Sequence, residues 1–272
     1  MGSHSTQKTI ADLEIVSLNG LAEKDDAEIR KLLRASSTAG MFYLDLRGPS
    51  TEGTFGDIAE IFKTAERFFN LPQESLEKNE ILHTGLERGY HAGKGFQYYE
   101  IPHIDFRSGS WELPKTLEVQ RDSIARTLQS FSDAAQAILW ELCAAAKINL
   151  PELDMNVNTT KSSDTALKIV FKPPIHDAGT VIHPGHTDSG LITLLWYDEE
   201  TTQIQILDAE GNGTDDWATV PVVEGCVLVN MADSLASSLE GFAHSTSHRV
   251  VAPPGEKRTR NGIMYLLRPY GT

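Results

Sequence analysis

Two histidines and one aspartate have residue types and a spacing that suit a metal centre. His186 and Asp188 are one residue apart in the segment HPGHTDSGLITLLW, and His248 follows in STSHRVV. Two imidazoles and a carboxylate on one side of an ion are the protein ligands of a non-haem Fe(II) centre, whose other positions stay open for dioxygen and a chelating co-substrate. We therefore expect these three residues to bind iron and to support dioxygen chemistry.

The sequence around these residues indicates how they would meet. Side chains alternate along a strand, so His186 and Asp188 would project to the same side of an extended segment. The third ligand then comes from another strand, and the residues after His248 are strand-like. His183 and His244 are competing ligands close by. A short His-x-Asp pattern also arises by chance, so structural, hydrogen-bonded histidines remain an alternative.

The elements that must position these residues fall into two parts. In the first part, apolar residues at helical spacing predict helices over 27–35, 55–69 and 117–146, with a short strand at 41–44. From residue 166 onward, apolar runs predict strands at 167–171, 191–196, 204–207, 226–230, 248–252 and 262–267. Strands at this spacing favour a sandwich or barrel. The segment 83–111 has no clear period and is predicted to be loop and irregular strand that covers a site. Four of its aromatic residues are candidates to line a pocket: Phe96, Tyr98, Tyr99 and Phe106.

Composition narrows the class of protein. A chain of 272 residues with 40% hydrophobic and 23% charged residues is typical of a globular protein, and one domain can accommodate it. The net charge of −14 argues against nucleic-acid binding, which normally needs a basic face. No apolar run has membrane-spanning length, and Cys143 and Cys226 suit buried thiols in a reducing compartment, so we expect a cytoplasmic protein without a membrane partner. Residues 1–4 are typical of an expression-tag remnant.

Short motifs occur in a fixed order along nearly the whole chain: GMFYL at 40–44, FFNLP at 68–72, RGY at 88–90, PP at 173–174, HTD at 186–188, VNMAD at 229–233 and STSHRV at 245–250. In this order they resemble the isopenicillin N synthase-like group of Fe(II)/2-oxoglutarate-dependent dioxygenases. The resemblance implies a single domain over 1–272 that is mainly β with α. A double-stranded β-helix, or jelly roll, would occupy 166–270, and a helix-rich part with a long supporting helix would occupy 5–150.

The resemblance also assigns roles to cations near the metal ligands. Arg258 lies where the family's Arg-x-Ser motif has the arginine that binds the distal carboxylate of 2-oxoglutarate. This chain departs from that motif, because Arg260 replaces the serine. It also has Lys172 before Pro173, where the family often has a tyrosine. Lys172 and Arg260 are therefore further candidates for the same carboxylate, unless both point outward.

The implied activity is oxidation of a C–H bond in a small organic molecule by Fe(II), 2-oxoglutarate and dioxygen. Hydroxylation, desaturation and ring formation are all open outcomes, and a substrate from specialised-metabolite biosynthesis is expected. Two alternatives remain. The altered Arg258-Thr259-Arg260 motif leaves room for an Fe(II) oxidase of the same fold that does not use 2-oxoglutarate. A non-catalytic β-barrel binding protein with structural histidines is the other. The sequence does not predict the oligomeric state.

Overall fold

The structure is a computed structural model that describes residues 9–79, 87–93, 95–148, 163–174, 179–208, 211–252 and 259–269. Its helices are α1 (Leu18–Ala22), α2 (Asp26–Ser37), the 3-10 helix η1 (Pro49–Thr51), α3 (Thr54–Phe69), α4 (Leu76–Asn79), α5 (His103–Ser108), α6 (Lys115–Glu118), α7 (Arg121–Ala146) and α8 (Asp233–Ser238). Its strands are β1 (Ile15–Ser17), β2 (Met41–Asp45), β3 (Gly89–Gly93), β4 (Phe96–Pro102), β5 (Ala166–Lys172), β6 (Val181–His186), β7 (Ile192–Tyr197), β8 (Thr202–Leu207), β9 (Gly213–Thr219), β10 (Cys226–Met231), β11 (His248–Val251) and β12 (Arg260–Leu267).

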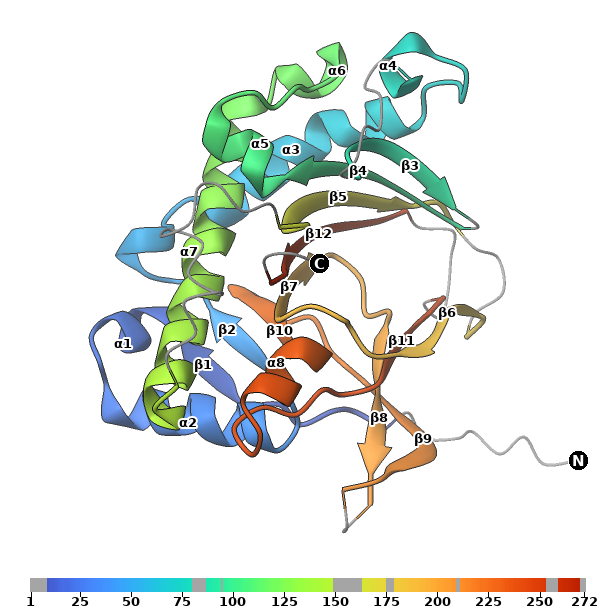
Figure 1. Cartoon of the computed structure of the whole chain (residues 1–272). Helices are drawn as coiled ribbons and strands as arrows, with labels where there is room; N and C mark the ends of the chain where they lie inside the picture. Colours follow the sequence, from blue (N-terminus) through green and yellow to red (C-terminus); the bar gives the residue numbers. More distant parts are fainter. Residues whose placement is uncertain are drawn as a thin grey trace, which may run out of the picture.

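The strands form two sheets. The larger sheet has the order β1-β2-β10-β7-β12-β5-β4-β3, and the smaller has the order β6-β11-β8-β9. All neighbouring pairs are antiparallel except β1 and β2. The helices α3 and α7 lie along the face of the larger sheet that is turned away from the smaller one (Figure 1). The facing sheets, the N-terminal helices and the long α7 confirm the fold class expected from the sequence.

The main core lies between these helices and the larger sheet. Helix α7 buries Leu128, Phe131 and Ile138 at helical spacing, and β5 contributes every second residue, Leu167, Ile169 and Phe171, to the same cluster. Because side chains alternate along a strand, Lys168, Val170 and Lys172 project from β5 to the opposite side, into the space between the two sheets. Packing of one face of β5 into the core therefore directs the two lysines on its other face into the space between the sheets.

A smaller apolar cluster fills part of the space between the sheets. It includes Met41 and Tyr43 of β2, Cys226 and Leu228 of β10, and Val220. Both cysteines are free thiols, as predicted from the sequence, but only Cys226 is buried, whereas Cys143 is partly exposed. The candidate ligands lie outside this apolar cluster, in the polar part of the space between the sheets.

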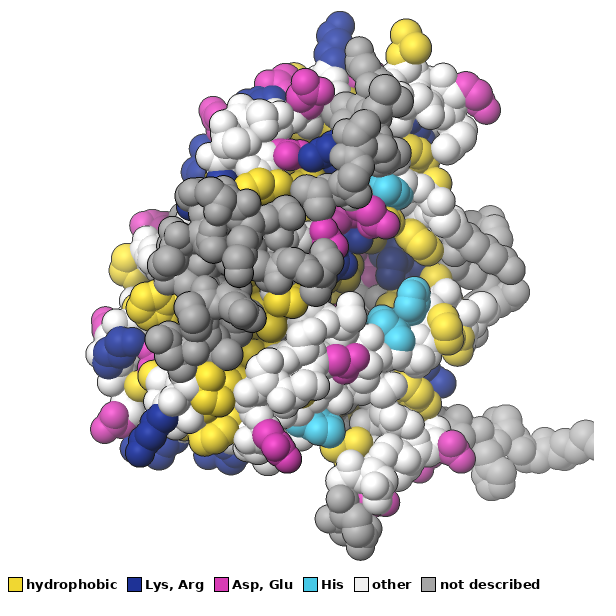
Figure 2. Space-filling model, in the orientation of Figure 1, with side chains coloured by type: hydrophobic (Ala, Val, Ile, Leu, Met, Phe, Trp, Pro, Cys, Tyr) yellow, Lys and Arg dark blue, Asp and Glu magenta, His cyan; other side chains and the backbone are white. Residues whose placement is uncertain are grey.

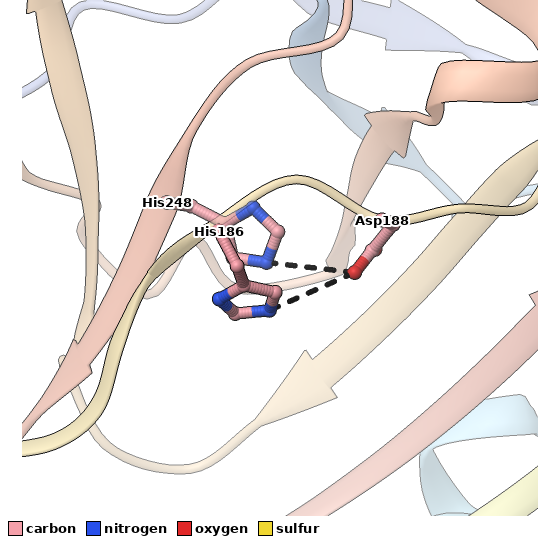
Figure 3. Close-up of side chains that lie close together, drawn as sticks. All are labelled: His186, Asp188 and His248. Carbon is pink, nitrogen blue, oxygen red and sulfur yellow. Dashed lines mark ion pairs between the residues drawn. The ribbon is translucent and has the colours of Figure 1, made fainter.

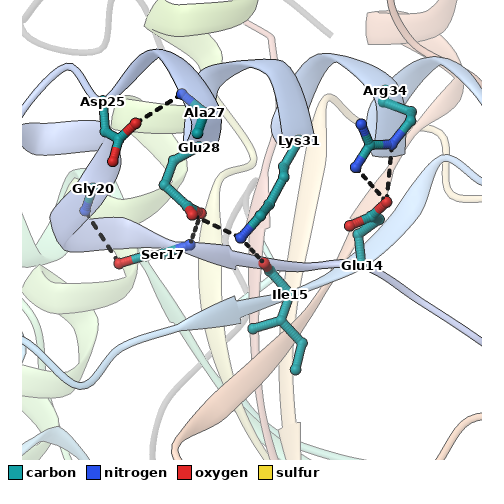
Figure 4. Close-up of polar contacts among 9 residues, drawn as sticks. All are labelled: Glu14, Ile15, Ser17, Gly20, Asp25, Ala27, Glu28, Lys31 and Arg34. Carbon is teal, nitrogen blue, oxygen red and sulfur yellow. Dashed lines mark hydrogen bonds and ion pairs between the residues drawn. The ribbon is translucent and has the colours of Figure 1, made fainter.

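The N-terminal helices are tied to β1 by capping and ion-pair contacts (Figure 4). Asp25 caps α2 by accepting from the backbone N–H of Ala27 at 2.7 Å, which satisfies a donor at the helix start. Glu28 of α2 accepts from the backbone N–H of Ser17 at 2.8 Å and pairs with Lys31 at 2.7 Å. These contacts fix α2 against the edge of the larger sheet.

Some elements differ from the sequence prediction. The helix predicted over 117–146 is divided into α6 and α7, with a break at Val119 and Gln120. The segment predicted to be loop and irregular strand contains two regular strands, β3 and β4, and β4 pairs with β5 over six residue positions. Within the described residues, the structure has no helix that is both long and apolar enough to span a membrane.

Candidate metal centre

Three side chains from two strands and one bend meet between the sheets. His186 is the last residue of β6, His248 is the first of β11, and the two residues are register partners. Asp188 lies in the bend after β6. Its Oδ1 atom lies 3.8 Å from Nε2 of His186 and 3.8 Å from Nε2 of His248 (Figure 3). The prediction that Asp188 shares a strand with His186 is wrong, because β6 ends at His186 and Asp188 lies two residues beyond it.

The backbone orients both imidazole rings. Nδ1 of His186 lies 2.9 Å from the carbonyl oxygen of Pro184, and Nδ1 of His248 lies 3.3 Å from that of Thr246. A proton on Nδ1 can donate to such a carbonyl, which leaves the Nε2 lone pair free to face the shared point. This is the arrangement found for metal-binding histidines.

Asp188 is oriented by two polar residues of the larger sheet. Thr193 Oγ1 donates to Asp188 Oδ2 at 2.6 Å, and Asn230 Nδ2 donates to the same oxygen at 3.0 Å. Oδ1 is thereby left to face the histidines. The sequence analysis did not single out Thr193 or treat Asn230 as part of the site. Their signal was present, because each is a polar residue within an otherwise apolar strand.

The loop of Thr187 and Asp188 is docked on the start of α8. Thr187 Oγ1 donates to Asp233 Oδ2 at 2.9 Å, and the backbone N–H of Asp233 donates to the carbonyl oxygen of Asp188 at 2.8 Å. The VNMAD motif that supplies Asn230 therefore also supplies Asp233. Two strand ends and one short helix together hold the carboxylate.

A glycine allows the segment before His248 to approach β2. Gly40 has φ +63°, and a Cβ atom there would lie 1.9 Å from the carbonyl oxygen of His244. The hydroxyl of Thr246 donates to the carbonyl oxygen of Ala39 beside it. Only glycine accepts both this left-handed conformation and this close approach, so Gly40 helps to fix the strand that carries His248.

The donor set fits one metal ion. Metal–nitrogen and metal–carboxylate bonds of about 2.1 Å allow two ligand atoms to be up to about 4.2 Å apart, and the two 3.8 Å separations lie within that limit. Within the described residues, this is the only group of three or more such side chains close enough to hold an ion. Burial lowers the pKa of His248, and the neutral form that results is the one a metal requires.

The competing histidines take other positions. Nδ1 of His183 lies 3.1 Å from Nδ1 of His186, behind the ring edge that faces Asp188. The backbone N–H of His244 donates to Ser36, and the imidazole of His244 does not join the cluster. His183 is thus a neighbour of the site.

Two of the three cations implied by the resemblance lie side by side. Lys172 and Arg260 are register partners on β5 and β12. Burial, followed by the positive charge of Arg260, lowers the pKa of Lys172 to about 8. Arg260 is 4% exposed; its Nη1 donates to the carbonyl oxygen of Val251 on β11 at 3.4 Å, and its Nη2 is buried without a hydrogen-bond partner. Among the described residues neither cation forms an ion pair, although the charges of Asp198 and Glu199 oppose the lowering of the Arg260 pKa by burial. Arg258 lies outside the described residues.

This pair is close to the ligand cluster. Val251, which accepts from Arg260, ends the strand that His248 begins. The charge of Lys172 is also among the causes, after burial and His186, that lower the pKa of His183. Figure 2 looks onto a hollow between the sheets in which Lys and Arg side chains lie beside histidines and acidic side chains.

The four aromatic candidates divide between two faces of β4 and its surroundings. The ring centres of Phe96 and Tyr98 are 6.1 Å apart. Both residues lie on the face of β4 that is turned toward the space between the sheets. Tyr99 belongs to the main core, and Phe106 packs against it. Only Phe96 and Tyr98 therefore remain candidates to line a pocket between the sheets.

Two family models match most of the chain. The 2OG-Fe(II) oxygenase superfamily matches residues 163–269, which include all three candidate ligands. The N-terminal model described as non-haem dioxygenase in morphine synthesis matches residues 12–122. Together they cover the helix-rich part and the facing sheets.

Individual relatives are similar over nearly the whole chain. A 2-oxoglutarate-dependent dioxygenase of Gibberella zeae is 26% identical over 95% of this chain and 80% of its own length. A homoarginine-6-hydroxylase of Arabidopsis thaliana is 24% identical over 82% of this chain and 65% of its own length. The crystal structure of a full-length Neurospora crassa protein in complex with alpha-KG superposes with a TM-score of 0.75 at 24% identity, covering 97% of this chain and 88% of that one.

Proposed function

Because this chain belongs to the 2OG-Fe(II) oxygenase superfamily, we propose that His186, Asp188 and His248 bind the Fe(II) with which it oxidises a C–H bond of a small organic molecule. This assignment rests on the approach of three ligand atoms, Nε2 of each histidine and Oδ1 of Asp188, to one point. The Nδ1 atoms of His186 and His248 both lie beside backbone carbonyl oxygens. When bound, iron and 2-oxoglutarate supply the oxidation, in which dioxygen is consumed and succinate and carbon dioxide are released.

The protein's own part is to bind, orient and shield. Three ligands on one side leave the remaining metal positions for the co-substrate and dioxygen. Thr193 and Asn230 hold Oδ2 of the Asp188 carboxylate, so that Oδ1 would be available to the ion. Both residues donate to Asp188 as an acceptor, which suits the ionised form that metal binding requires.

Lys172 and Arg260 are proposed to bind the distal carboxylate of 2-oxoglutarate. Two largely buried cations that form no ion pair among the described residues are costly to bring together. An incoming carboxylate would balance this charge and would satisfy the orphaned Nη2 of Arg260. The same pair favours a 2-oxoglutarate-dependent enzyme over an oxidase that uses no such acid.

A substrate in specialised-metabolite biosynthesis remains part of this proposal. The Arabidopsis relative is named for homoarginine, a small polar molecule, and it is only 24% identical to this chain over 242 aligned residues. Similarity at that level supports a small-molecule substrate without choosing one. The substrate class has to come from the side chains of this chain's own cavity.

Metal and co-substrate binding test the proposal directly. Anaerobic titration of the purified protein with Fe(II) and then 2-oxoglutarate should give one equivalent of each, with the visible charge-transfer absorption expected of a chelated Fe(II)–keto acid complex. His186→Ala should weaken Fe(II) binding by at least about a hundredfold, because one of three ligands is lost. His244→Ala is the matched control and should bind like the wild type.

Turnover gives the second readout. The wild type should release succinate when a substrate is found in a small-molecule screen, and His186→Ala should release none. Substrate-dependent succinate formation by His186→Ala, or Fe(II) binding that survives the substitution, would contradict the triad assignment.

A further inference from the structure

The inner face of the larger sheet carries two more cations, which the sequence analysis did not single out. Lys168 lies four residues before Lys172 on β5 and therefore on the same face. Arg268 follows β12 in the same alternation as Arg260 and Met264. The cavity between the sheets thus has a second basic region, at some distance along the strands from the proposed 2-oxoglutarate site.

Lys168 is already balanced by acidic neighbours. Its ammonium lies 3.2 Å from Glu100 Oε2, 3.9 Å from Glu87 Oε2 and 4.4 Å from the centre of the Tyr98 ring. Glu100 is 2% exposed, and its burial raises its pKa to about 7, against the opposing effect of Lys168. An ammonium held between two carboxylates and an aromatic ring forms part of the cavity wall and has little attraction left for another anion.

Arg268 is not balanced in this way. Its Nη1 donates to the carbonyl oxygen of Asp164 at 3.0 Å, and its guanidinium forms no ion pair with any described residue. Its charge reaches Glu100 and Tyr98, where it opposes the effect of burial, the main cause that raises both pKa values. Because both residues share the inner-face alternation of β4, the guanidinium acts on the cavity side of the sheet.

The position of Arg268 is built into the fold. Its backbone N–H donates to Thr165 Oγ1 at 2.9 Å, and its carbonyl oxygen accepts from Ser163 Oγ at 2.8 Å. Its side chain also passes Gly190, where a Cβ atom would lie 3.2 Å from Arg268 Cγ and 2.8 Å from the carbonyl oxygen of Leu267. Gly190 is two residues beyond Asp188, so the absence of a side chain there lets Arg268 pass beside the metal-ligand loop.

We propose that Arg268 binds a carboxylate of the substrate, and that the enzyme therefore acts on a small organic acid. This rests on the proposed function, since it places the acid in the cavity next to His186, Asp188 and His248. A guanidinium can hold a carboxylate through two parallel hydrogen bonds. Met264 and Leu266 lie on the same inner face of β12, between Arg260 and Arg268. Because these two side chains are apolar, we expect the rest of the acid to be apolar as well.

The charge balance selects a carboxylate over a phosphate. A phosphate monoester carries a charge of about −1.5 to −2 at neutral pH, which needs a second free cation. Lys168 is committed to Glu100 and Glu87, and Lys172 and Arg260 are assigned to 2-oxoglutarate. One guanidinium without an ion pair among the described residues balances one carboxylate.

The test compares acids with their neutral counterparts on the loaded enzyme. The protein is saturated with Mn(II) and 2-oxoglutarate under nitrogen, so that the Lys172–Arg260 site is filled. A panel of alkanoic and arylalkanoic acids, beginning with 3-phenylpropionate, is then titrated by calorimetry alongside the corresponding primary amides. Wild type, Arg268→Met and Arg268→Lys are compared, with Arg126→Met as a control on the outer face of α7, where Arg126 pairs with Asp57.

The wild type and Arg126→Met should bind the best acid at least about tenfold more tightly than its amide, since a charge-assisted bond is lost with the amide. Arg268→Met should lose this preference, and Arg268→Lys should recover part of it. An acid preference that survives in Arg268→Met, or a wild type that binds no acid better than its amide, overturns the inference. The first titration separates the two proposals. If the wild type fails to bind 2-oxoglutarate, the proposed function fails, whereas normal 2-oxoglutarate binding without an acid preference removes Arg268 alone.

Discussion

Lys172 and Lys168 lie four residues apart on the same face of β5, yet their neighbours across the sheet carry opposite charges. Lys172 is the register partner of Arg260 on β12. Lys168 is the register partner of Glu100 on β4, and their charged groups are 3.2 Å apart. One lysine thus stands beside a second cation, and the other completes an ion pair.

The difference separates a binding position from a structural one. A partly buried pair of like charges is costly without an anion, which supports the proposal that a ligand binds there. An ion pair of opposite charges needs no ligand, and it orders the cavity wall around Tyr98. Charge balance between cross-strand partners, more than the presence of a lysine, identifies the proposed co-substrate site.

The largest expected effect is on 2-oxoglutarate affinity. Arg260→Met should raise the Kd for 2-oxoglutarate by about a hundredfold, because a two-point, charge-assisted contact is worth about 2–3 kcal/mol. Lys172→Met should raise it by about tenfold. Anaerobic titration of the Fe(II)-loaded protein measures both values.

Lys168→Met is the matched control for that experiment, since it removes the same charge from the same strand face. Its Kd for 2-oxoglutarate should stay within about twofold of the wild type. If Lys168→Met weakened 2-oxoglutarate binding as much as Lys172→Met, the contrast between the two lysines would be lost.

The sequence predicts the three candidate ligands better than it predicts the residues that orient them. His186, Asp188 and His248 could be selected because their residue types and flanking motifs are local features. The orientation of the Asp188 carboxylate depends on Thr193 and Asn230, which approach it only through the order β10-β7 within the sheet. Strand alternation alone could not supply this, because β6 ends at His186.

The cations show a similar limit. Lys172 and Arg260 were candidates from the sequence, but the sequence did not predict whether their side chains point inward or outward. The answer depends on the β5–β12 register, which joins residues far apart in the chain. The pairing of Lys168 with Glu100 was missed because the segment that contains β4 has no clear hydrophobic period.

A smaller effect is expected on the stability of the metal-free protein, and it should have opposite sign for the two lysines. Lys172→Met should raise the free energy of unfolding by about 1 kcal/mol, since it removes a largely buried like-charge contact. Lys168→Met should lower it by about 2 kcal/mol, because Glu100 is left buried without its partner. Urea denaturation near neutral pH measures both changes.

The double variant Lys168→Met/Glu100→Leu tests whether that loss comes from the unpaired carboxylate. Replacing both charges by apolar side chains should restore stability to within about 1 kcal/mol of the wild type. A double variant as unstable as Lys168→Met would assign the loss to packing of the lysine side chain instead.

The smallest expected effect is a pH dependence that only one of the lysines produces. Burial and the adjacent Arg260 lower the pKa of Lys172 to about 8 in the ligand-free protein. 2-Oxoglutarate prefers the charged form, so its affinity is highest below that pKa and falls as the pH rises through it. The Kd should increase by about twofold between about pH 7 and pH 8, where half of the Lys172 ammonium groups have lost their proton. Arg260 stays charged over this range, and burial and His186 lower the pKa of His183, so neither contributes to the slope. Glu100 has a pKa of about 7, but it pairs with Lys168 and not with Lys172 or Arg260. The Kd of Lys172→Met for 2-oxoglutarate should be larger than that of the wild type and independent of pH. The Kd of Lys168→Met should change with pH as that of the wild type does. Equal slopes in the wild type and Lys172→Met would show that another group titrates, and would remove Lys172 from the co-substrate site.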